Sequence, residues 1–591
     1  MNVMAHHLRI ALAQLNFLVG DIEGNAQKII QATKTAQNHY KADLIVFPEL
    51  ALTGYPPEDL LYRHDLYQRI EAIFPAICNS GTNIDILLGH PANTVTGCYN
   101  RVTFISHQKI ISHYDKQRLP NYSVFDEARY FKPGSTTTGV ISCKKIKMAT
   151  IICEDLWFPE PIAQAAKAGV ELIISLNASP FAKNKAEIRK QIMKQRIAET
   201  HLPILYVNCV GGQDELVFDG GSMAFDRDAS LIQQAPFFEE SLCIVDIEKS
   251  HPGFINIATQ DDNHANPPSL TTTSSLASKE ISQIYKALVL GTRDYIEKNN
   301  FPKAILGLSG GIDSALTLAI AVDAIGKERV EAILMPSRYN AETSLIDAKQ
   351  QAETMGVHYE ILSIEPIFQA FLNTLYSLLH PSPAYKDISD LKDISITEQN
   401  LQARCRGTLL MAISNKKHAI VLSTGNKSEM GVGYSTLYGD MVGGFCVLKD
   451  VFKTMVYKLA EYRNSLSPVI PENVLLKAPS AELAPNQKDE DTLPPYPILD
   501  GILERYIELD ESLSDIVNAG FEEAVVLKVL QMVDRSEYKR RQAAPGIRIS
   551  ERAFGKDRRY PITSGFRPLV AVEDPTHNGD HYSTSFTANS T

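Results

Sequence analysis

The run SGGIDS at residues 309–314 lies between an apolar stretch and a helical one, and it constrains the fold more than any other part of the chain. Residues 304–308 predict a buried strand and residues 314–325 a helix. Two glycines let the backbone approach a ligand closely, and a helix start directs free N–H groups at an anion. The run therefore predicts a phosphate-binding loop in an α/β fold, without the GK[ST] ending of the kinase-type P-loop. Asp313 lies beside those phosphates, so we expect Mg²⁺ between them.

Bulk properties narrow the class of protein. The chain has 591 residues, which favours two domains, and its net charge of -11 argues against nucleic acid as a partner. There is no apolar run of about 18 residues that could span a membrane. Residues 1–7 lack the charged and apolar parts of a signal peptide, and the 8 cysteines form no CxxC pair. A cytoplasmic location with reduced thiols is therefore expected.

The pattern of elements divides the chain. Apolar runs at 9–14, 43–47, 84–89, 148–152 and 171–176 predict strands, with helices near 25–40 and 184–200 and a last strand near 243–247. A polar segment with a Pro-Pro pair then predicts a linker, after which strands and helices alternate as in a doubly wound parallel sheet. We expect a first domain at 1–257, a linker at 258–277, a second domain at 278–575 and a disordered tail at 576–591.

Several ordered strings in the second domain carry a resemblance. SGGIDS is similar to the signature of the ATP pyrophosphatases, which cleave ATP between the α- and β-phosphates. The strings that follow it are QNLQAR (399–404), LSTGNKSE (422–429), YGD (438–440), VFKT (451–454), KAPSAEL (477–483) and YKRRQ (538–542). Together they resemble the NAD synthetase family across nearly all of residues 278–570. The resemblance implies an adenine nucleotide α-hydrolase-like fold that adenylates deamido-NAD with ATP and Mg²⁺ and then amidates it, the last step of NAD biosynthesis.

The resemblance also implies residue roles. The residues expected to bind ATP are Gly307, Leu308, Ser309, Gly310, Gly311, Ile312, Asp313, Ser314, Arg338, Thr424, Lys453 and Ser480. Those expected to bind deamido-NAD are Asn400, Arg404, Glu429, Asp440 and Lys539. Asp313 and Glu429 would hold the magnesium ion. For a single lysine or arginine a solvated surface charge is the alternative, and for Asn400 or Asp440 a helix cap or turn.

Three residues in the first domain suit a nitrogen-releasing site, two of them at the ends of apolar runs. They are Glu49 in FPEL, Lys116 in YDKQRLPNY and Cys153 in IICEDLW. In this order they resemble the catalytic triad of the nitrilase superfamily, in its amidase branch, across residues 8–250. The resemblance implies an αββα sandwich in which Cys153 attacks the amide of glutamine, Glu49 moves protons and Lys116 stabilises the oxyanion. Expected at the glutamine site are Tyr122, Glu127 (which would orient Lys116), Ser179 and Lys185.

The two resemblances together point to the glutamine-dependent NAD synthetases, with deamido-NAD, ATP and glutamine as small-molecule partners and a homo-oligomer, at least a dimer, as the assembly. Other ATP-dependent amidotransferases, such as GMP or asparagine synthetase, are the alternative among enzymes. Their glutaminases differ, because this chain has no GxCxG nucleophile elbow and residue 2 is asparagine. A nucleotide-binding regulator without turnover is the alternative of another class. An internal tunnel for ammonia between the two sites is a further hypothesis.

Overall fold

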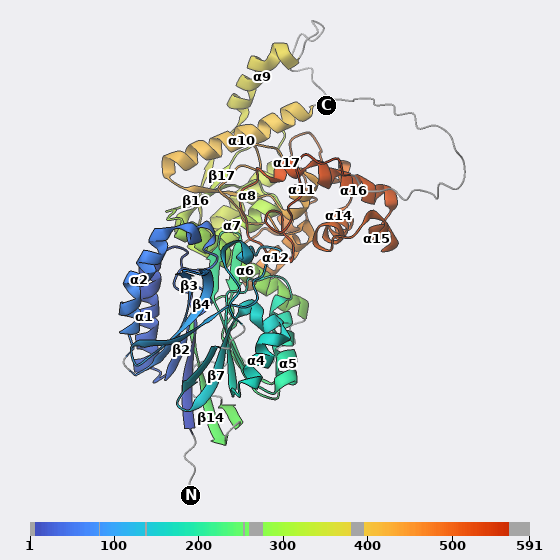
Figure 1. Ribbon diagram of the computed structural model, residues 1–591. Coiled ribbons are helices and arrows are strands. Elements are labelled where there is room, and N and C mark those ends of the chain that lie inside the picture. Colours follow the sequence, from blue (N-terminus) through green and yellow to red (C-terminus); the bar gives the residue numbers. More distant parts are fainter. Residues whose placement is uncertain are drawn as a thin grey trace, which may run out of the picture.

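The computed structural model of the chain describes residues 6–81, 83–135, 139–251, 254–258, 276–379 and 395–566. Figure 1 shows two layered parts, a blue-to-green sandwich below and a yellow-to-red part above. The expected linker at 258–277 lies almost wholly outside the described residues, and so does the whole tail at 576–591.

The first part is built from two facing sheets. One sheet consists, in spatial order, of β15 (Phe254–Ala258), β14 (Ser241–His251), β1 (His6–Gln14), β2 (Leu44–Val46), β3 (Asp85–Thr94), β4 (Gly97–Ser106) and β5 (Lys109–Asp115). The other consists of β13 (Leu231–Gln234), β12 (Met223–Phe225), β9 (Ile204–Asn208), β8 (Leu172–Asn177), β7 (Ile146–Ile152) and β6 (Gly139–Cys143). Their inner faces share one apolar cluster that includes Ile10, Leu44 and Ile174.

Helices cover both outer faces of the sandwich. The helices α1 (Ile22–Asn38) and α2 (His64–Cys78) pack on the first sheet, and α4 (Pro159–Lys167) and α5 (Lys185–Thr200) on the second. Their apolar stripes explain this position, since Ile22, Ala26 and Ile29 of α1 are all buried. The expected αββα sandwich is confirmed.

The second part contains a parallel sheet. Its spatial order is β18 (His358–Ile361), β17 (Val330–Leu334), β16 (Ala304–Gly307), β19 (Ile420–Ser423) and β20 (Phe445–Cys446). The order of connection reverses between β16 and β19, and in such folds ligands bind in the crevice beyond the carboxyl ends of these strands. The SGGIDS run follows β16 and the STGNKSE residues follow β19. The expected doubly wound sheet is therefore confirmed, and its switch point lies at the two strings with the clearest chemical signature.

Helices flank this sheet on both faces. One face is covered by α6 (Leu276–Lys298), α7 (Ile312–Ile325), α8 (Glu342–Met355) and α12 (Lys453–Leu466). The other face is covered by α9 (Glu365–Leu379) and α10 (Ile396–Lys417). The remaining helices are α11 (Lys427–Val432), α13 (Glu472–Leu476), α14 (Tyr496–Leu503), α15 (Leu513–Asn518), α16 (Glu523–Arg535) and α17 (Glu537–Arg540). Of these, α11, α14, α15 and α16 share a separate apolar cluster next to the sheet.

The two parts meet along α6. The hairpin of β10 (Val210–Gln213) and β11 (Leu216–Asp219) leaves the sandwich and packs on this helix. At the crossing, a Cβ on Gly212 would come within 3.0 Å of the Gly291 Cα, so the two backbones are in close contact. Val217 of the hairpin belongs to the same apolar cluster as Leu288 of α6. The sites on the two parts are thus held on one packed framework.

Candidate active sites

A lysine between two carboxylates lies deep in the sandwich. Lys116 follows β5, Glu49 follows β2, and Glu127 begins the short helix α3 (Glu127–Tyr130). Lys116 Nζ donates to Glu49 Oε1 at 2.7 Å and to Glu127 Oε1 at 2.8 Å, and all three side chains are buried. Burial alone would lower the pKa of Lys116, but Glu127 and Glu49 outweigh burial and hold this pKa well above its usual value. Lys116 is therefore a fixed positive charge.

Cys153 lies at the end of β7, where it begins the 3₁₀ helix η2 (Cys153–Trp157). Its φ of 45° is unusual for a residue with a side chain, and such conformations concentrate at functional sites. Burial raises the pKa of the Cys153 thiol well above its usual value, Glu49 raises it further and Lys116 lowers it. The thiol is therefore protonated at neutral pH, and a base must remove its proton before the sulfur can attack.

The Glu49 carboxylate is held in place by further hydrogen bonds. Its Oε1 also accepts from Asn100 Nδ2 at 2.7 Å, and its Oε2 accepts from the Ala178 N–H at 3.0 Å. Burial raises the pKa of Glu127 to about 7, while Lys116 opposes this shift and Glu49 adds to it. Asn100 is absent from the residues predicted by sequence, because it lies within β4 in a string without a chemical signature.

Asp155 joins the loop of the lysine to the strand of the cysteine. Its Oδ1 accepts the N–H groups of Gln117 and Arg118 at 3.0 and 2.8 Å. Its Oδ2 accepts the Ile152 N–H at 3.1 Å and the Tyr114 hydroxyl at 2.9 Å. The carboxylate is fully buried, and burial raises the pKa of Asp155 to about 6. One side chain thus fixes the spacing between the segments that carry Lys116 and Cys153.

Charged and aromatic groups surround the mouth of this site. The Tyr122 hydroxyl donates to both oxygens of Glu154 at 3.1 Å, and the Tyr122 ring is half exposed. Lys185 begins α5, with its Nζ 4.6 Å from the centre of the Trp157 ring. Burial lowers the pKa of Lys185. Glu154 is absent from the predicted residues, although its place directly after Cys153 could have revealed it.

Ser179, after β8, is fixed by a buried ion pair. Arg189 Nε donates to Ser179 Oγ at 3.0 Å, while Arg189 Nη1 donates to both oxygens of Asp219 at 2.7 and 2.9 Å. The Ser179 N–H donates to Asn208 Oδ1 at 2.9 Å. These three partners come from different elements, so no local string in the sequence could indicate them.

The SGGIDS loop has the geometry of a phosphate cradle. A Cβ on Gly310 would lie 2.2 Å from the Ser344 carbonyl oxygen, and the φ of Gly310 is 82°, so only glycine fits. Ser314 Oγ donates to the Gly311 carbonyl at 3.0 Å. The side chains of Leu308 and Ile312 lie in the apolar core, which leaves only their backbone atoms for a nucleotide. Gly307 and Ser309 complete the turn out of β16.

A second lysine between two carboxylates lies beside this loop. Lys453, the first residue of α12, donates through Nζ to Asp313 Oδ2 at 2.5 Å and to Glu429 Oε1 at 3.2 Å. Asn426 Nδ2 donates to Asp313 Oδ1 at 2.9 Å. Burial raises the pKa of Glu429 to about 8, with Lys453 opposing the shift and Asp313 and then Asp489 adding to it.

The donor set around Lys453 suits a divalent cation. Three carboxylates, Asp313, Glu429 and Asp489, act on this one lysine. Asp489 Oδ2 accepts the Tyr496 hydroxyl at 2.8 Å, but Asp489 Oδ1 is buried and has no partner among the described residues. The excess negative charge and the spare oxygen fit Mg²⁺, which prefers oxygen ligands and phosphates.

The other residues predicted for ATP lie around the crevice. Thr424 lies in the turn after β19 and is half-buried. Ser480 Oγ donates to the Gln487 carbonyl at 2.5 Å, within a loop whose Glu482 accepts the Ser344 hydroxyl at 2.6 Å. The loop is thereby tied to the residue that contacts Gly310. Arg338 lies further out and is paired with Glu365, its Nε 2.6 Å from the carboxylate.

Four residues predicted for deamido-NAD converge on the loop 433–440. Thr436 donates through Oγ1 to Asn400 Oδ1 at 2.8 Å and through its N–H to Asp440 Oδ1 at 2.6 Å. Arg404 Nε donates to the Leu437 carbonyl at 3.2 Å. From far along the sequence, the Lys539 Nζ donates to the carbonyls of residues 433 and 435 at 2.8 and 2.9 Å. The structure therefore assembles residues that the sequence separates widely.

Comparisons with known proteins agree with this geometry. The carbon-nitrogen hydrolase family matches residues 9–251 and the NAD synthase family matches residues 284–543. A glutamine-dependent NAD(+) synthetase from Acinetobacter baylyi is 47% identical over 565 residues, covering 95% of this chain and 99% of that relative. The chain belongs to the glutamine-dependent NAD(+) synthetases. A relative with the same description from Thermotoga maritima is 42% identical over 95% of this chain and 99% of its own length.

Solved structures of this synthetase family share the arrangement. The glutamine-dependent NAD+ synthetase of Acinetobacter baumannii, in complex with ADP, matches with a TM-score of 0.72 at 44% identity, covering 95% of this chain and 100% of that one. The synthetase of Cytophaga hutchinsonii has the same fold, with a TM-score of 0.76 at 21% identity, covering 95% of this chain and 98% of that one. The family resemblance inferred from the sequence is confirmed.

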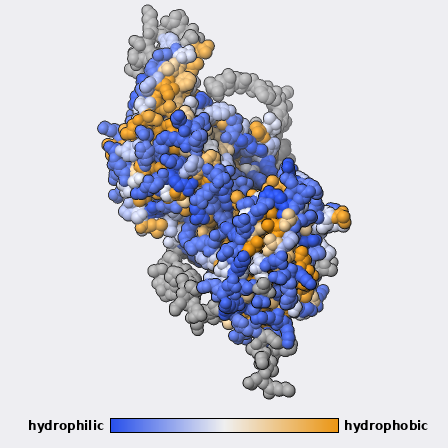
Figure 2. Space-filling model, turned by 90° about the vertical axis from the view of Figure 1, so that its left-hand side faces the viewer, coloured by the Kyte–Doolittle hydropathy of each residue, from blue (hydrophilic) through white to orange (hydrophobic). Residues whose placement is uncertain are grey.

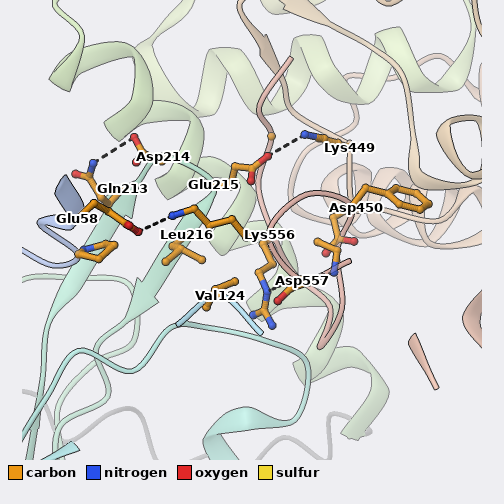
Figure 3. Close-up of a pocket in the computed structure, with 15 residues that line it drawn as sticks. Glu58, Val124, Gln213, Asp214, Glu215, Leu216, Lys449, Asp450, Lys556 and Asp557 are labelled. Atoms are coloured by element: carbon orange, nitrogen blue, oxygen red, sulfur yellow. Dashed lines mark hydrogen bonds and ion pairs between the residues drawn. The ribbon is translucent and has the colours of Figure 1, made fainter. Parts of the chain in front are cut away.

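A cavity of about 60 Å³ lies between the two parts of this synthetase (Figure 3). Ion pairs cross the junction beside it, from Lys449 to Glu215 at 2.8 Å and from Lys556 to Glu58 at 2.5 Å. A smaller cavity of about 20 Å³ lies against Glu49 and extends to Lys298 of α6. The space around the first site thus borders the helix that both parts share.

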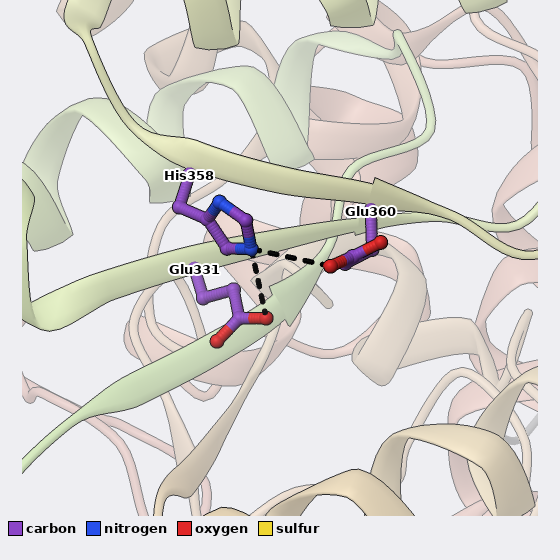
Figure 4. Close-up of side chains that lie close together, drawn as sticks. All are labelled: Glu331, His358 and Glu360. Atoms are coloured by element: carbon purple, nitrogen blue, oxygen red, sulfur yellow. Dashed lines mark hydrogen bonds and ion pairs between the residues drawn. The ribbon is translucent and has the colours of Figure 1, made fainter.

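One further group of titratable side chains lies apart from both sites. Glu331 of β17 and His358 and Glu360 of β18 place their polar atoms close together, as Figure 4 shows. Lys417 is already paired with Glu331, and the side chains of His358 and Glu360 are exposed. The group resembles a solvated surface cluster.

Among the described residues, no helix is both long and apolar enough to cross a membrane.

Proposed function

We propose that this chain converts deamido-NAD to NAD, using ATP to activate the nicotinate carboxylate and glutamine as the source of ammonia, and releasing AMP, pyrophosphate and glutamate. One observation carries the proposal: the same chain holds a buried Glu49–Lys116 pair beside Cys153 and a phosphate cradle at the switch point of a parallel sheet. The family membership supports both halves of the reaction.

Ammonia is released at the first site. Glu49 takes the thiol proton of Cys153, and the sulfur attacks the side-chain amide carbon of glutamine. Lys116 stabilises the oxyanion, since its two carboxylates keep it charged and aimed. Glu49 then returns the proton to the leaving nitrogen, which breaks the C–N bond and frees ammonia. Glu49 next takes a proton from water, whose oxygen displaces the sulfur and yields glutamate, and it returns this proton to the Cys153 sulfur.

The mouth of the first site offers a partner for each charged group of glutamine. Lys185 pairs with the α-carboxylate and Glu154 with the α-ammonium group. Tyr122 orients Glu154 through its two hydrogen bonds, and Ser179 contributes its hydroxyl. Glu127 acts on the substrate through Lys116, which it orients at 2.8 Å.

Activation occurs at the second site. The backbone of residues 309–314 binds the phosphates, and Lys453 offsets the charge that develops as pyrophosphate leaves. A carboxylate oxygen of deamido-NAD attacks the α-phosphorus, and ammonia then displaces AMP from the acyl carbon. Asp313 and Glu429 would hold Mg²⁺, which would neutralise phosphate charge there. Thr424, Ser480 and Arg338 contact the nucleotide from the rim.

Residues around the loop 433–440 hold the dinucleotide. Asn400 and Asp440 offer amide and carboxylate groups to hydroxyls, while Arg404 and Lys539 offer positive charge to its phosphates. Glu429 accepts from Lys453 beside the ATP loop and precedes the loop 433–440 by four residues in the chain, so it reaches both substrates. The ammonia crosses inside the chain, along the cavities at Glu49 and at the junction of the two parts.

One assay tests the proposal. Purified chain is mixed with deamido-NAD, ATP, Mg²⁺ and glutamine, and NAD, AMP and glutamate are measured, with ammonium replacing glutamine in a parallel reaction. We expect NAD and AMP in equal amounts from both nitrogen sources. Absence of NAD in both reactions would overturn the proposal, and ADP in place of AMP would overturn α–β cleavage.

We also propose that the chain works in the cytoplasm as a homo-oligomer, at least a dimer. All 8 cysteines are free thiols, which suits a reducing compartment. Figure 2 shows hydrophobic side chains gathered over the upper part of the molecule, where α9 and α10 lie. Phe371, Leu378 and Ile396 of these helices are exposed. A second copy would cover them beside the dinucleotide residues of α10, and sedimentation of the chain at micromolar concentration as a monomer would contradict this assembly.

A further inference from the structure

Lys427 is a fully buried lysine that neither site uses. It begins α11, directly after Asn426, and its side chain has 0% exposure. Its Nζ donates to Glu508 Oε1 at 2.6 Å and to Ser550 Oγ at 2.8 Å, and lies 2.7 Å from Asp450 Oδ1. A buried ammonium group is costly unless it is paired in this way, and an apolar side chain of similar volume usually serves packing as well. A role in packing alone therefore does not explain why a charged residue stands at this position.

On one side Lys427 adjoins the ATP site. Asn426, the residue before it, donates to Asp313 of the phosphate loop at 2.9 Å. Ser428, the residue after it, accepts the Lys453 N–H at 2.9 Å. Any movement of Asp313 or Lys453 when nucleotide binds is thus passed to the first turn of α11.

On the other side Lys427 fixes the segment 548–552. Its partner Asp450 accepts the N–H groups of Ile549 and Ser550 at 2.8 and 2.7 Å, and Lys427 itself also donates to the Arg552 carbonyl at 3.0 Å. Residues 549, 550 and 552 of the segment are therefore held by one cluster of charges around a single ammonium group.

The same segment is seated on the sandwich. The Ile549 carbonyl accepts the Lys183 N–H at 2.9 Å, and the Arg548 N–H donates to the Glu215 carbonyl at 2.8 Å. Lys183 lies two residues before Lys185, at the mouth of the first site. Ile549 also belongs to the apolar cluster that both parts share. Segment 548–552 is thus in contact with the ATP-site helix through Lys427 and with the glutamine site through Lys183.

We propose that Lys427 is a positioning residue that links the two active sites, holding the segment 548–552 in register with the nucleotide site so that glutamine hydrolysis stays matched to NAD formation. The inference rests on the proposed function of the two sites. It assigns no contact with substrate to Lys427, which acts only through α11 and the segment.

The first experiment measures how much glutamate is released for each NAD that is formed. In Lys427→Met, and in Lys427→Met with Glu508→Gln to keep the buried charge balanced, we expect glutamate released per NAD to rise about fivefold or more over the wild type. NAD formation from ammonium should stay within about threefold of the wild type, since the groups of the second site are intact. The control is Arg463→Met, which removes another buried cation of this part, paired with Asp323 at 2.7 Å and with no hydrogen bond to the segment 548–552 among the described residues. An unchanged ratio, or an equal rise in the control, would overturn the proposal.

A second experiment does not depend on turnover. Hydrogen exchange of the amides of residues 179–189 and 548–552 is measured in the full chain with and without ATP and Mg²⁺. We expect ATP to slow exchange in both segments by about threefold or more in the wild type and in Arg463→Met, and not in Lys427→Met. Equal slowing in Lys427→Met, or none in the wild type, would overturn the link. Because this readout needs no NAD, failure of the proposed function and failure of the link can be told apart.

Discussion

The two sites are built on the same arrangement of charges and differ in how complete it is. Lys116 bridges Glu49 and Glu127 in the sandwich, and Lys453 bridges Asp313 and Glu429 beside the parallel sheet. The first group is sealed, with side-chain exposures of 0 to 5%. In the second group the carboxylates are 16 and 19% exposed.

This difference indicates where each site obtains the charges that its reaction needs. The nucleophile, base and cation proposed for the first site all belong to the chain, so burial can tune them before substrate arrives. The second site has an excess of carboxylate, with Asp489 as the third group, and leaves one oxygen without a partner among the described residues. Its missing positive charge must come with the nucleotide. Substitutions in the first site should therefore affect one nitrogen source, whereas those in the second should affect both.

The largest effect is expected from Cys153→Ala. Without the nucleophile, glutamine-driven NAD formation should fall by at least about 10³-fold, while ammonium-driven formation should stay within about twofold. Product formation from each nitrogen source is measured on the same preparation. Cys243→Ala is the matched control, because this thiol is also buried in the sandwich yet lines neither cavity and has no proposed role. Loss of the ammonium-driven reaction in Cys153→Ala would break the division between the sites.

Lys453→Met tests the second of the two sites compared above. It leaves Asp313, Glu429 and Asp489 without their cation and removes a positive charge from the phosphates, so both reactions should slow by about 10²-fold or more. Steady-state rates with glutamine and with ammonium are compared. Lys458→Met on the same helix removes an exposed charge and should leave both rates unchanged. A variant of Lys453 that slowed only the glutamine-driven reaction would contradict the assignment.

A smaller effect is expected from Asp155→Asn. The asparagine oxygen can still accept the Gln117 and Arg118 N–H groups, but its amide would face the Ile152 N–H, where a donor meets a donor. The Lys116 and Cys153 segments should then separate slightly, and the glutamine-driven kcat should fall by about 10- to 100-fold with little change in KM. Alkylation of Cys153 by iodoacetamide provides a second readout.

The control for this substitution is Asp246→Asn, which changes another buried carboxylate of the sandwich. Asp246 is paired with Arg9 at 2.8 Å, away from the triad. Both the kcat from glutamine and the alkylation rate should stay at the wild-type value in the control. A change in KM with kcat unaltered, or an equal loss of kcat in the control, would contradict this positioning role of Asp155.

The triad could be identified from the sequence because Glu49 and Cys153 lie at the ends of apolar runs and all three residues lie in recognisable strings. The residues that hold the triad in place could not be identified from the sequence. Asn100 contacts Glu49 across 51 positions, and Arg189 contacts Asp219 across 30, so both depend on tertiary packing. The parallel strands β16, β17 and β19 were predictable as apolar runs. Strand β14 was expected as the last strand near 243–247, but its partner β15 was not, and β15 ends at residue 258, where the linker was expected to begin.

The smallest effect concerns the proton that Glu127 binds in the folded chain. Burial raises the pKa of Glu127 to about 7 from 4.5, so the folded chain binds a proton that the unfolded chain releases. Stability from this group is full below pH 4.5 and is lost as the pH rises through about 7. A loss of about 2 kcal/mol would lower the melting temperature of a chain this long by only about 2 °C. Melting curves at pH 5 and pH 8 should show this decrease in the wild type and a smaller one in Glu127→Gln, which can still accept from Lys116. Equal decreases in both would mean that Glu127 is ionised at pH 5 as well as at pH 8. The buried group around Lys116 would then carry one more negative charge than it does with a protonated Glu127.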